Sequence, residues 1–84
     1  MTDREYEIID ALYFTVSFDF LKMELETEES VLVTELIALI KKDWVKCLEK
    51  VSEIEIEDIE LVAKNYTNYN FLASKKGLTI HNSR

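Results

Sequence analysis

Proline is absent from this 84-residue sequence, and glycine and cysteine occur once each, as Gly77 and Cys47. A single glycine excludes a glycine-rich phosphate-binding loop. A single cysteine excludes an internal disulfide, and together with the one histidine, His81, it is too few for a zinc site. We expect Cys47 to be a small buried residue, with a redox-sensing thiol as the alternative, and His81 to lie at the surface near a frayed terminus.

Long apolar runs are also missing, since the longest, residues 36–40, has five residues. A helix needs about 20 apolar residues to cross a bilayer, so we expect no membrane association. The first ten residues, MTDREYEIID, are charged and have no apolar core of the kind found in signal peptides. Together with the single cysteine, this start predicts a protein of the reducing cytoplasm.

The net charge is −7, and the charges are unevenly distributed. Residues 1–40 hold ten acidic and two basic residues, whereas residues 61–84 hold four basic residues and no acidic one. The first half therefore repels phosphate, and the last segment could attract it weakly. Hydrophobic residues make up 48% of the chain and charged residues 32%, which is typical of a folded protein. At this length we expect one domain, residues 1–84.

The many carboxylates form no catalytic pattern. The most acidic run, residues 53–58, alternates with aliphatic residues, and a solvated strand or helix edge explains it. A nucleophile, a base and an orienting group cannot be assembled from the sequence. A domain this small also has little core to give up for a deep pocket. We therefore expect a protein that is not an enzyme and has no cofactor, metal or small-molecule substrate.

Three helices are expected in the first half of the chain. Apolar residues recur at spacings of three and four from Tyr6 to Val16, which predicts the first helix, interrupted near its end by β-branched residues. Ser17 is a suitable N-cap for a second helix over residues 18–26, and Thr27 is one for a third. Leucine and isoleucine at helical spacing place the third helix at the centre of the core.

The second half of the chain mixes strand and helix patterns. Residues 44–48 alternate as in a short strand, and residues 69–73 predict another. Between them, a short helix is favoured over residues 57–66, and the asparagine-rich segment 65–70 is typical of a turn.

The only glycine leaves two interpretations of the last segment open. In the first, Lys75, Lys76 and Gly77 form a hairpin loop, which the helix dipole favours because lysines in a first helical turn oppose it. In the second, Ser74 caps a final helix and Gly77 lies in its first turn, where a missing side chain allows close packing. Local chemistry does not decide between them.

The order of these elements resembles the winged helix-turn-helix fold of many bacterial transcription regulators. In that family an aromatic–valine strand commonly follows the third helix, as Trp44 and Val45 do here. The second wing strand commonly ends in a tyrosine, a leucine, a small or hydroxylated pair and, after two further residues, a glycine. The matching residues are Tyr69, Leu72, Ala73, Ser74 and Gly77. The resemblance implies an α+β domain with a three-helix core, a short β-wing and a C-terminal helix that Gly77 opens close to the first helix.

The resemblance also implies a regulator, and DNA binding is one hypothesis. The third helix would then be the recognition helix, but it has no arginine, and its outward positions include Glu28, Glu29 and Glu35. Glutamates repel the phosphate backbone, so we interpret this face as merely solvated. Six lysines could contact nucleic acid on the wing side: Lys41, Lys42, Lys46, Lys64, Lys75 and Lys76.

Protein association, including a homodimer, is the hypothesis that we place ahead of direct DNA binding. Winged-helix domains also serve as interaction modules, and their terminal helices often form dimers. The first helix carries Tyr6, Tyr13 and Phe14, and aromatic residues are enriched at interfaces. For any single one of them, a place in the small core is the favoured interpretation. The apolar residues of this helix spread around more than one face, which favours an interface.

Overall fold

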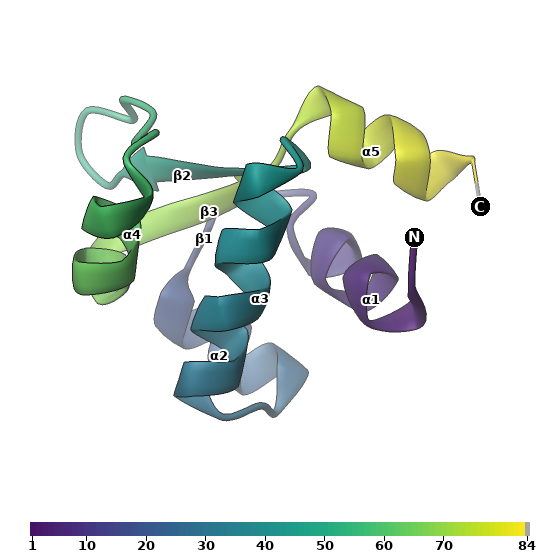
Figure 1. The fold of residues 1–84 in the computed structure, drawn as a ribbon, viewed down its shortest axis with the longest axis horizontal. Coiled ribbons are helices and arrows are strands. Elements are labelled where there is room, and N and C mark those ends of the chain that lie inside the picture. The colour runs from purple at the N-terminus through teal and green to yellow at the C-terminus, as the bar shows by residue number, and fades with distance from the viewer. Residues whose placement is uncertain (84) are drawn as a thin grey trace.

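The computed structural model describes residues 1–83 and confirms an α+β chain. Its helices pack with a three-stranded antiparallel sheet (Figure 1). Arg84, one of the four basic residues of the last segment, lies outside the described residues. The elements are, in order, α1 (Asp3–Ala11), β1 (Val16–Ser17), α2 (Phe18–Leu25), α3 (Glu29–Lys41), β2 (Val45–Glu49), α4 (Ile59–Asn65), the 3₁₀ helix η1 (Tyr66–Asn68), β3 (Tyr69–Ala73) and α5 (Lys75–Asn82).

The first helix is shorter than its apolar periodicity predicts. Thr2 and Glu5 form a capping box at its start, which satisfies two backbone N–H groups. It ends at Ala11 and not near Val16, because Val16 and Ser17 pair with β3 as the two-residue strand β1. The periodicity was therefore misleading beyond Ala11, and β1 was not predicted from the sequence.

The N-cap predicted for α2 is correct, and the one predicted for α3 is wrong. The Ser17 hydroxyl accepts a hydrogen bond from the Phe20 N–H at 3.1 Å, so Ser17 is the N-cap of α2 as predicted. Thr27 does not cap α3, whose N-cap position is Glu28 and has no side-chain hydrogen bond. The left-handed backbone at Glu26, with φ of 50°, turns the chain so that α3 begins one residue later than expected.

The sheet has the strand order β1-β3-β2. The pairing of β2 with β3 runs from Val45 opposite Ala73 to Glu49 opposite Tyr69, which confirms both predicted strands. Buried side chains alternate along β2 at Val45 and Cys47, as the period of two requires. The free edge of β2 is partly covered by the chain that follows it, since the Ile56 N–H donates to the Cys47 carbonyl at 2.7 Å.

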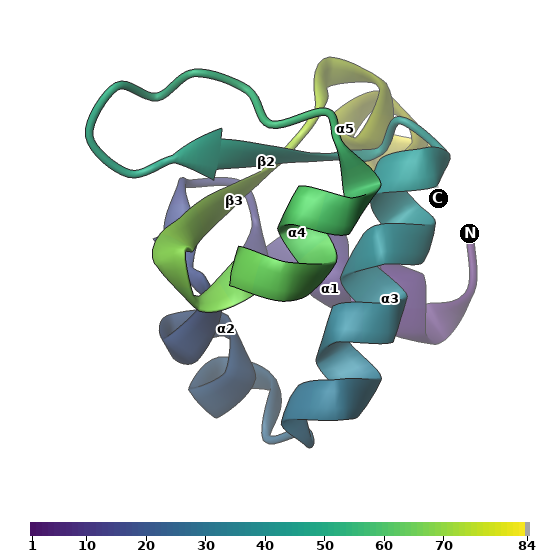
Figure 2. The same cartoon turned by 60° about the vertical axis from the view of Figure 1, so that its left-hand side comes forward.

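A wide loop and a short helix connect β2 to β3 (Figure 2). The helix predicted over residues 57–66 is present as α4, shortened to Ile59–Asn65 by the N-cap Asp58. The Asp58 carboxylate accepts from the Glu60 N–H at 2.9 Å. The segment 65–70 contains η1 and the start of β3, so the turn expected there is a single 3₁₀ turn.

The structure decides the question of the glycine in favour of a helix. The Gly77 N–H donates to the Ser74 hydroxyl at 3.0 Å, and α5 follows, so the hairpin interpretation is wrong. A Cβ atom on Gly77 would lie 2.3 Å from the carbonyl oxygen of Trp44, well inside van der Waals contact. The close approach that requires glycine is therefore to the backbone before β2, whereas α5 as a whole packs beside α1.

The core lies where α1, α2 and α3 meet the sheet. Ile9, Leu12, Phe18, Leu32 and Phe71 are completely buried and come from four of these elements and the turn after α1. The third helix contributes three buried leucines, which confirms its expected place at the centre. The aromatic rings of Phe18 and Phe71 lie 6.4 Å apart and join α2 to β3.

Candidate functional site

The seam between α1 and α5 is built around His81. Its ring is 7% exposed and stacks on the ring of Tyr6, with 3.9 Å between centroids. Its Nδ1 atom lies 2.7 Å from the Tyr13 hydroxyl, and its Nε2 atom lies 3.5 Å from an Asp10 carboxylate oxygen. The expectation of a surface histidine is therefore wrong, because two tyrosines distant in sequence enclose the ring.

This seam changes the interpretation of the three aromatic residues proposed for an interface. Tyr6 and Tyr13 both pack against His81, and the Tyr13 hydroxyl also donates to the Asn82 side-chain oxygen at 2.8 Å. These two tyrosines hold α5 against α1 within the chain. Phe14 follows them in the turn after α1, and 82% of its surface is exposed. Of the three, Phe14 is therefore the residue most available to a partner.

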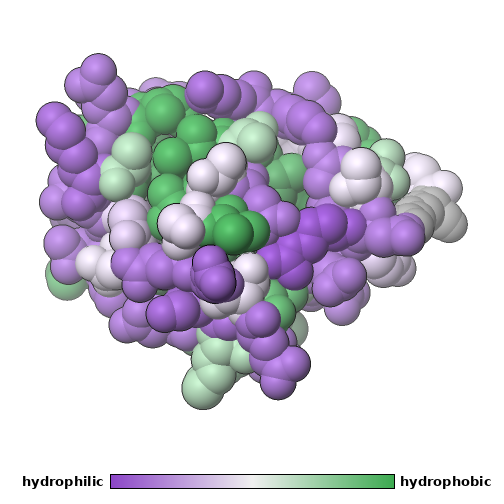
Figure 3. Space-filling model, turned by 60° about the horizontal axis from the view of Figure 1, so that its bottom comes forward, coloured by the Kyte–Doolittle hydropathy of each residue, from purple (hydrophilic) through white to green (hydrophobic). Residues whose placement is uncertain are grey.

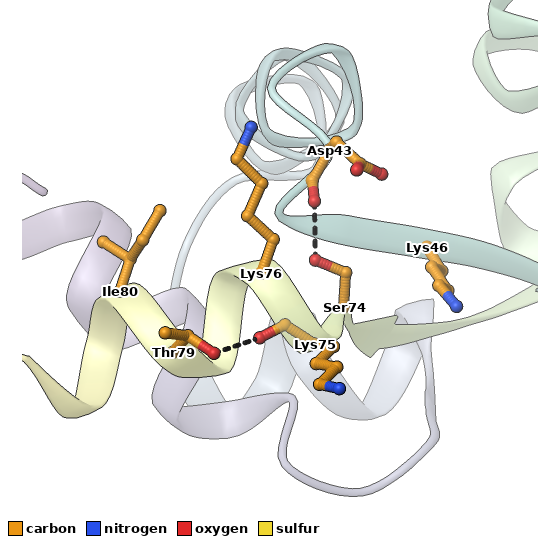
Figure 4. A pocket seen from close by; sticks show the side chains of 7 residues that line it. All are labelled: Asp43, Lys46, Ser74, Lys75, Lys76, Thr79 and Ile80. Atoms are coloured by element: carbon orange, nitrogen blue, oxygen red, sulfur yellow. Dashed lines mark hydrogen bonds between the residues drawn. The ribbon is translucent and has the colours of Figure 1, made fainter.

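The structure brings three of the six candidate lysines to one place. Lys46, Lys75 and Lys76 line an open hollow of about 600 Å³ between the end of α3, β2 and α5 (Figure 4). Lys46 is half-buried on β2, and the two lysines of α5 are exposed. Figure 4 shows Lys46 and Lys76 on different flanks of the hollow, with Lys75 on a third side. None of the three forms an ion pair with any described residue.

The other three candidate lysines are arranged differently. Lys41 is exposed at the end of α3, close in the chain to Asp43 at the rim of the hollow. Lys42 forms an ion pair with Glu5 and lies over the Trp44 ring, 4.7 Å from its centroid. Lys64 lies on α4, which precedes β3, whereas the hollow adjoins α5, which follows it. Lys41, Lys42 and Lys64 therefore do not line the hollow with Lys46, Lys75 and Lys76.

The acidic face of α3 is only partly solvated. The Glu35 carboxylate accepts two hydrogen bonds from the Arg4 guanidinium, at 2.7 and 2.9 Å, and the bond raises the pKa of Arg4. The Glu29 carboxylate accepts from the Tyr66 hydroxyl, and this hydrogen bond raises the pKa of Tyr66. Glu28 alone of the three is exposed. The interpretation of a merely solvated face therefore needs correction at Glu29 and Glu35, which join α3 to its neighbours.

The single cysteine is a core residue. Cys47 is completely buried, and burial raises the pKa of its thiol to about 12. A redox-sensing cysteine needs an accessible thiolate, so the alternative of a thiol sensor is wrong for this folded chain. Within residues 1–83, no three His, Cys, Asp or Glu side chains are placed to hold a metal ion. Over the same residues, no helix has both the length and the apolar character needed to cross a bilayer.

Several exposed apolar residues were not singled out from the sequence. Figure 3 shows one face where apolar side chains gather within a largely hydrophilic surface. Met23 on α2 is 70% exposed, and Val51 and Ile54 in the loop after β2 are 95% and 63% exposed. The alternation of residues 53–58 places the acidic residues on the solvated side, so it gave no signal that Ile54 is exposed. No periodic signal marks Val51, which lies in an irregular loop.

Comparison with known proteins gave no match to a family model, a curated protein or a solved structure.

Proposed function

We propose that this chain is a cytoplasmic regulatory module of the winged-helix type that acts through protein association, self-association into a homodimer included, and not through catalysis. The order of elements supports the winged-helix part of the proposal. Three helices precede a strand that begins after Trp44, β2 pairs antiparallel with β3, and α5 follows β3 after Ser74 alone. The pair β2–β3 with its connecting loop takes the place of the wing.

The charges of the surface favour protein partners over DNA. The exposed residues of the first half of α3, including Ser30, Val31 and Thr34, are uncharged, and Glu28 precedes them. The loop between β2 and α4 adds the exposed acids Glu53 and Glu55. A helix and a wing of this composition offer few cations to neutralise phosphates, and most non-specific DNA affinity comes from such cations.

The observation that carries the proposal is the exposure of Phe14. Phe14 is 82% exposed, and its burial by a partner would favour association, by about 1.5–3 kcal/mol for full burial. Phe14 also lies beside the seam in which Tyr13 and His81 fix α5 against α1. Because the hydroxyl contacts of Tyr13 hold the residue before Phe14, less conformational entropy is lost when a partner covers Phe14.

Sedimentation equilibrium of the wild-type chain at micromolar concentration tests the proposal directly. We expect a monomer–dimer equilibrium whose dissociation constant rises at least about tenfold in Phe14→Ser, since each subunit of a symmetric dimer loses the buried ring. The matched control is Phe20→Ser, which makes the same change at a phenylalanine of α2 that is 45% exposed. A strictly monomeric wild type, or an equal effect of the two variants, would contradict self-association through this surface.

Direct DNA binding is the second candidate function, and the cluster of Lys46, Lys75 and Lys76 favours it. Binding of a mixed-sequence duplex at low salt, measured by fluorescence anisotropy, tests this candidate. It predicts affinity that falls steeply with salt and falls again when Lys75 and Lys76 are changed to glutamate. No binding even at low salt removes the candidate.

A further inference from the structure

We propose that the hollow beside α5 is a docking site for an acidic segment of a partner protein, in which one aliphatic residue lies between two carboxylates. The inference concerns a surface separate from Phe14, so it holds whether or not the chain forms a dimer. The hollow lies at the junction of α3, β2 and α5, and Phe14 lies in the turn between α1 and β1.

The charge of the hollow selects an anionic ligand. Three lysines and one acidic residue, Asp43, line it, in a chain whose net charge is −7. The three ammonium groups are available, because none of them pairs with a carboxylate of the described residues. Lys46 comes from a strand and Lys76 from a helix, on different flanks in Figure 4, so a ligand between them meets cations from more than one side.

The floor of the hollow adds an apolar requirement. Half-buried Ile80 closes one end, and the Thr79 hydroxyl is already bonded to the Lys75 carbonyl at 2.9 Å, which leaves its methyl group for contact. The Ser74 hydroxyl is likewise occupied, since it donates to the Asp43 carbonyl at 2.6 Å and accepts from Gly77. The polar atoms of the floor are thus satisfied within the chain, and the surface left for a ligand is aliphatic, bordered by lysine side-chain stems.

The length of the hollow sets the size of the ligand. Ser74 and Ile80 are six residues apart along α5, which corresponds to about 9 Å of helix. An extended chain covers about 9–10 Å with three residues. A segment of the form acidic–aliphatic–acidic therefore spans the hollow, with its aliphatic side chain on the floor and a carboxylate toward each flank.

A protein segment fits this surface better than a nucleic acid does. The cations are grouped around one short hollow, whereas a duplex needs cations spread along its backbone. The chain has a segment of the required chemistry itself, residues 53–57, but its backbone is held on β2 through Ile54 and Ile56. This held segment is less free to enter the hollow of another copy than a flexible segment of a partner is.

A synthetic peptide with the sequence of residues 53–60, EIEIEDIE, serves as the probe, labelled for fluorescence anisotropy and capped at both ends. Two control peptides separate the two requirements. In one, the acidic residues are replaced by their amides, and in the other the isoleucines are replaced by serine. The protein variants are Lys75→Glu/Lys76→Glu and, as a single charge reversal away from the hollow, Lys64→Glu on α4. Circular dichroism checks that each variant is folded.

We expect the acidic–aliphatic peptide to bind, and each control peptide to bind at least about fivefold more weakly, because each loses one of the two kinds of contact. We expect Lys75→Glu/Lys76→Glu to weaken binding about tenfold and Lys64→Glu to change it less than about twofold. Peptide binding should be unchanged in Phe14→Ser, which separates this inference from the proposed function.

Several results would overturn the inference. The first is that the probe peptide does not bind even at millimolar concentration. An equal loss of affinity in Lys75→Glu/Lys76→Glu and Lys64→Glu would show attraction without a defined site. Tighter binding of a DNA duplex than of the peptide would assign the lysines to nucleic acid. If full-length chain with Ile54→Ser stops associating while the peptide still binds wild type, the occupant is a second copy and not a different protein.

Discussion

The first turns of α1 and α5 begin alike and differ in how their charges are used. Each helix starts after a hydroxyl N-cap, Thr2 or Ser74, that accepts a backbone hydrogen bond. The first turn of α1 holds acidic residues, which suit the positive end of the helix dipole. The first turn of α5 holds two lysines, which oppose it.

The charged residues of the two first turns also differ in whether they have partners within the chain. In α1, Arg4 binds Glu35 through two hydrogen bonds, and Glu5 binds Lys42, so both charges tie the helix to α3 and the turn after it. In α5, Lys75 and Lys76 form no ion pair with a described residue. Charges that stabilise the fold find partners within it, and charges that oppose local stability are better explained by a ligand outside it.

The largest effect on stability is expected at Gly77, where α5 packs against the backbone of Trp44. Gly77→Ala places a Cβ atom 2.3 Å from the Trp44 carbonyl oxygen, and a backbone group cannot move aside as a flexible side chain can. We expect a loss of about 1–3 kcal/mol in the free energy of unfolding, larger than the gain in helix propensity of up to about 1 kcal/mol. Urea denaturation followed by circular dichroism measures it.

Lys76→Ala is the control for this experiment, since it introduces alanine at the preceding, exposed position of the same turn. It should leave stability unchanged or raise it slightly. A Gly77→Ala variant as stable as Lys76→Ala would mean that α5 can shift away from Trp44, and that the close approach is not needed for the fold.

Reversing the charges in the first turn of α5 should have a smaller effect of opposite sign. In Lys75→Glu/Lys76→Glu, unfavourable charges at the positive end of the dipole become favourable ones, which should raise the free energy of unfolding by about 0.5–2 kcal/mol at low salt. Thermal unfolding at low and high salt measures it, because salt screens the dipole interaction. A decrease in stability would show that the two lysines have partners inside the fold, and would remove the contrast with α1.

The smallest change in the free energy of unfolding is expected in α1, where the ion pair of Glu5 can be tested by lowering the pH. The hydrogen bond from Lys42, reinforced by the Thr2 backbone N–H, holds the pKa of Glu5 below its ordinary value. A carboxylate with a lowered pKa adds stability above its unfolded-state pKa and loses it as the pH falls through its folded-state pKa. We expect Glu5→Gln to be about 0.5 kcal/mol less stable than wild type near pH 6.

This difference should disappear as the pH is lowered from about 5 toward 3, below the ordinary range of a glutamate. Glutamine is the suitable replacement because it removes the charge and keeps a side-chain oxygen that can accept from Thr2 in the capping box. Chemical denaturation of both proteins across this range measures the effect. A stability difference that does not vary with pH would assign the role of Glu5 to the cap and not to its charge.

Local chemistry in the sequence was enough to predict elements whose signals lie within a few residues. The hydroxyl of Ser17 preceded an apolar periodic run, so this cap was predicted, whereas the cap at Ser74 stayed one of two open interpretations until the structure showed α5. Thr27 carried an equally good local signal and still failed, because the left-handed backbone at Glu26 moved the start of α3. No pattern of nearby residues shows which of several suitable caps the chain geometry will use.

The candidate sites depended on contacts that local patterns do not contain. Tyr13 was proposed for an interface from the sequence, but its partner within the chain, His81, is 68 residues away, and their contact makes His81 part of a buried seam and not the expected surface residue. The two lysines of α5 were recognised from the sequence as a basic pair. Their association with Lys46, which lies on the edge strand of the sheet, required the fold.

The sequence by itself determined the α+β composition, the central helix α3, the strands β2 and β3, and the cap at Ser17, because each follows from apolar periodicity or from hydrogen bonds between neighbouring residues. Tertiary structure alone decided the pairing of β1, the burial of His81, the contact of Gly77 with Trp44 and the gathering of three lysines around one hollow. The physical reason is that these features join residues brought together only when the helices pack on the sheet, so no short stretch of sequence contains both partners.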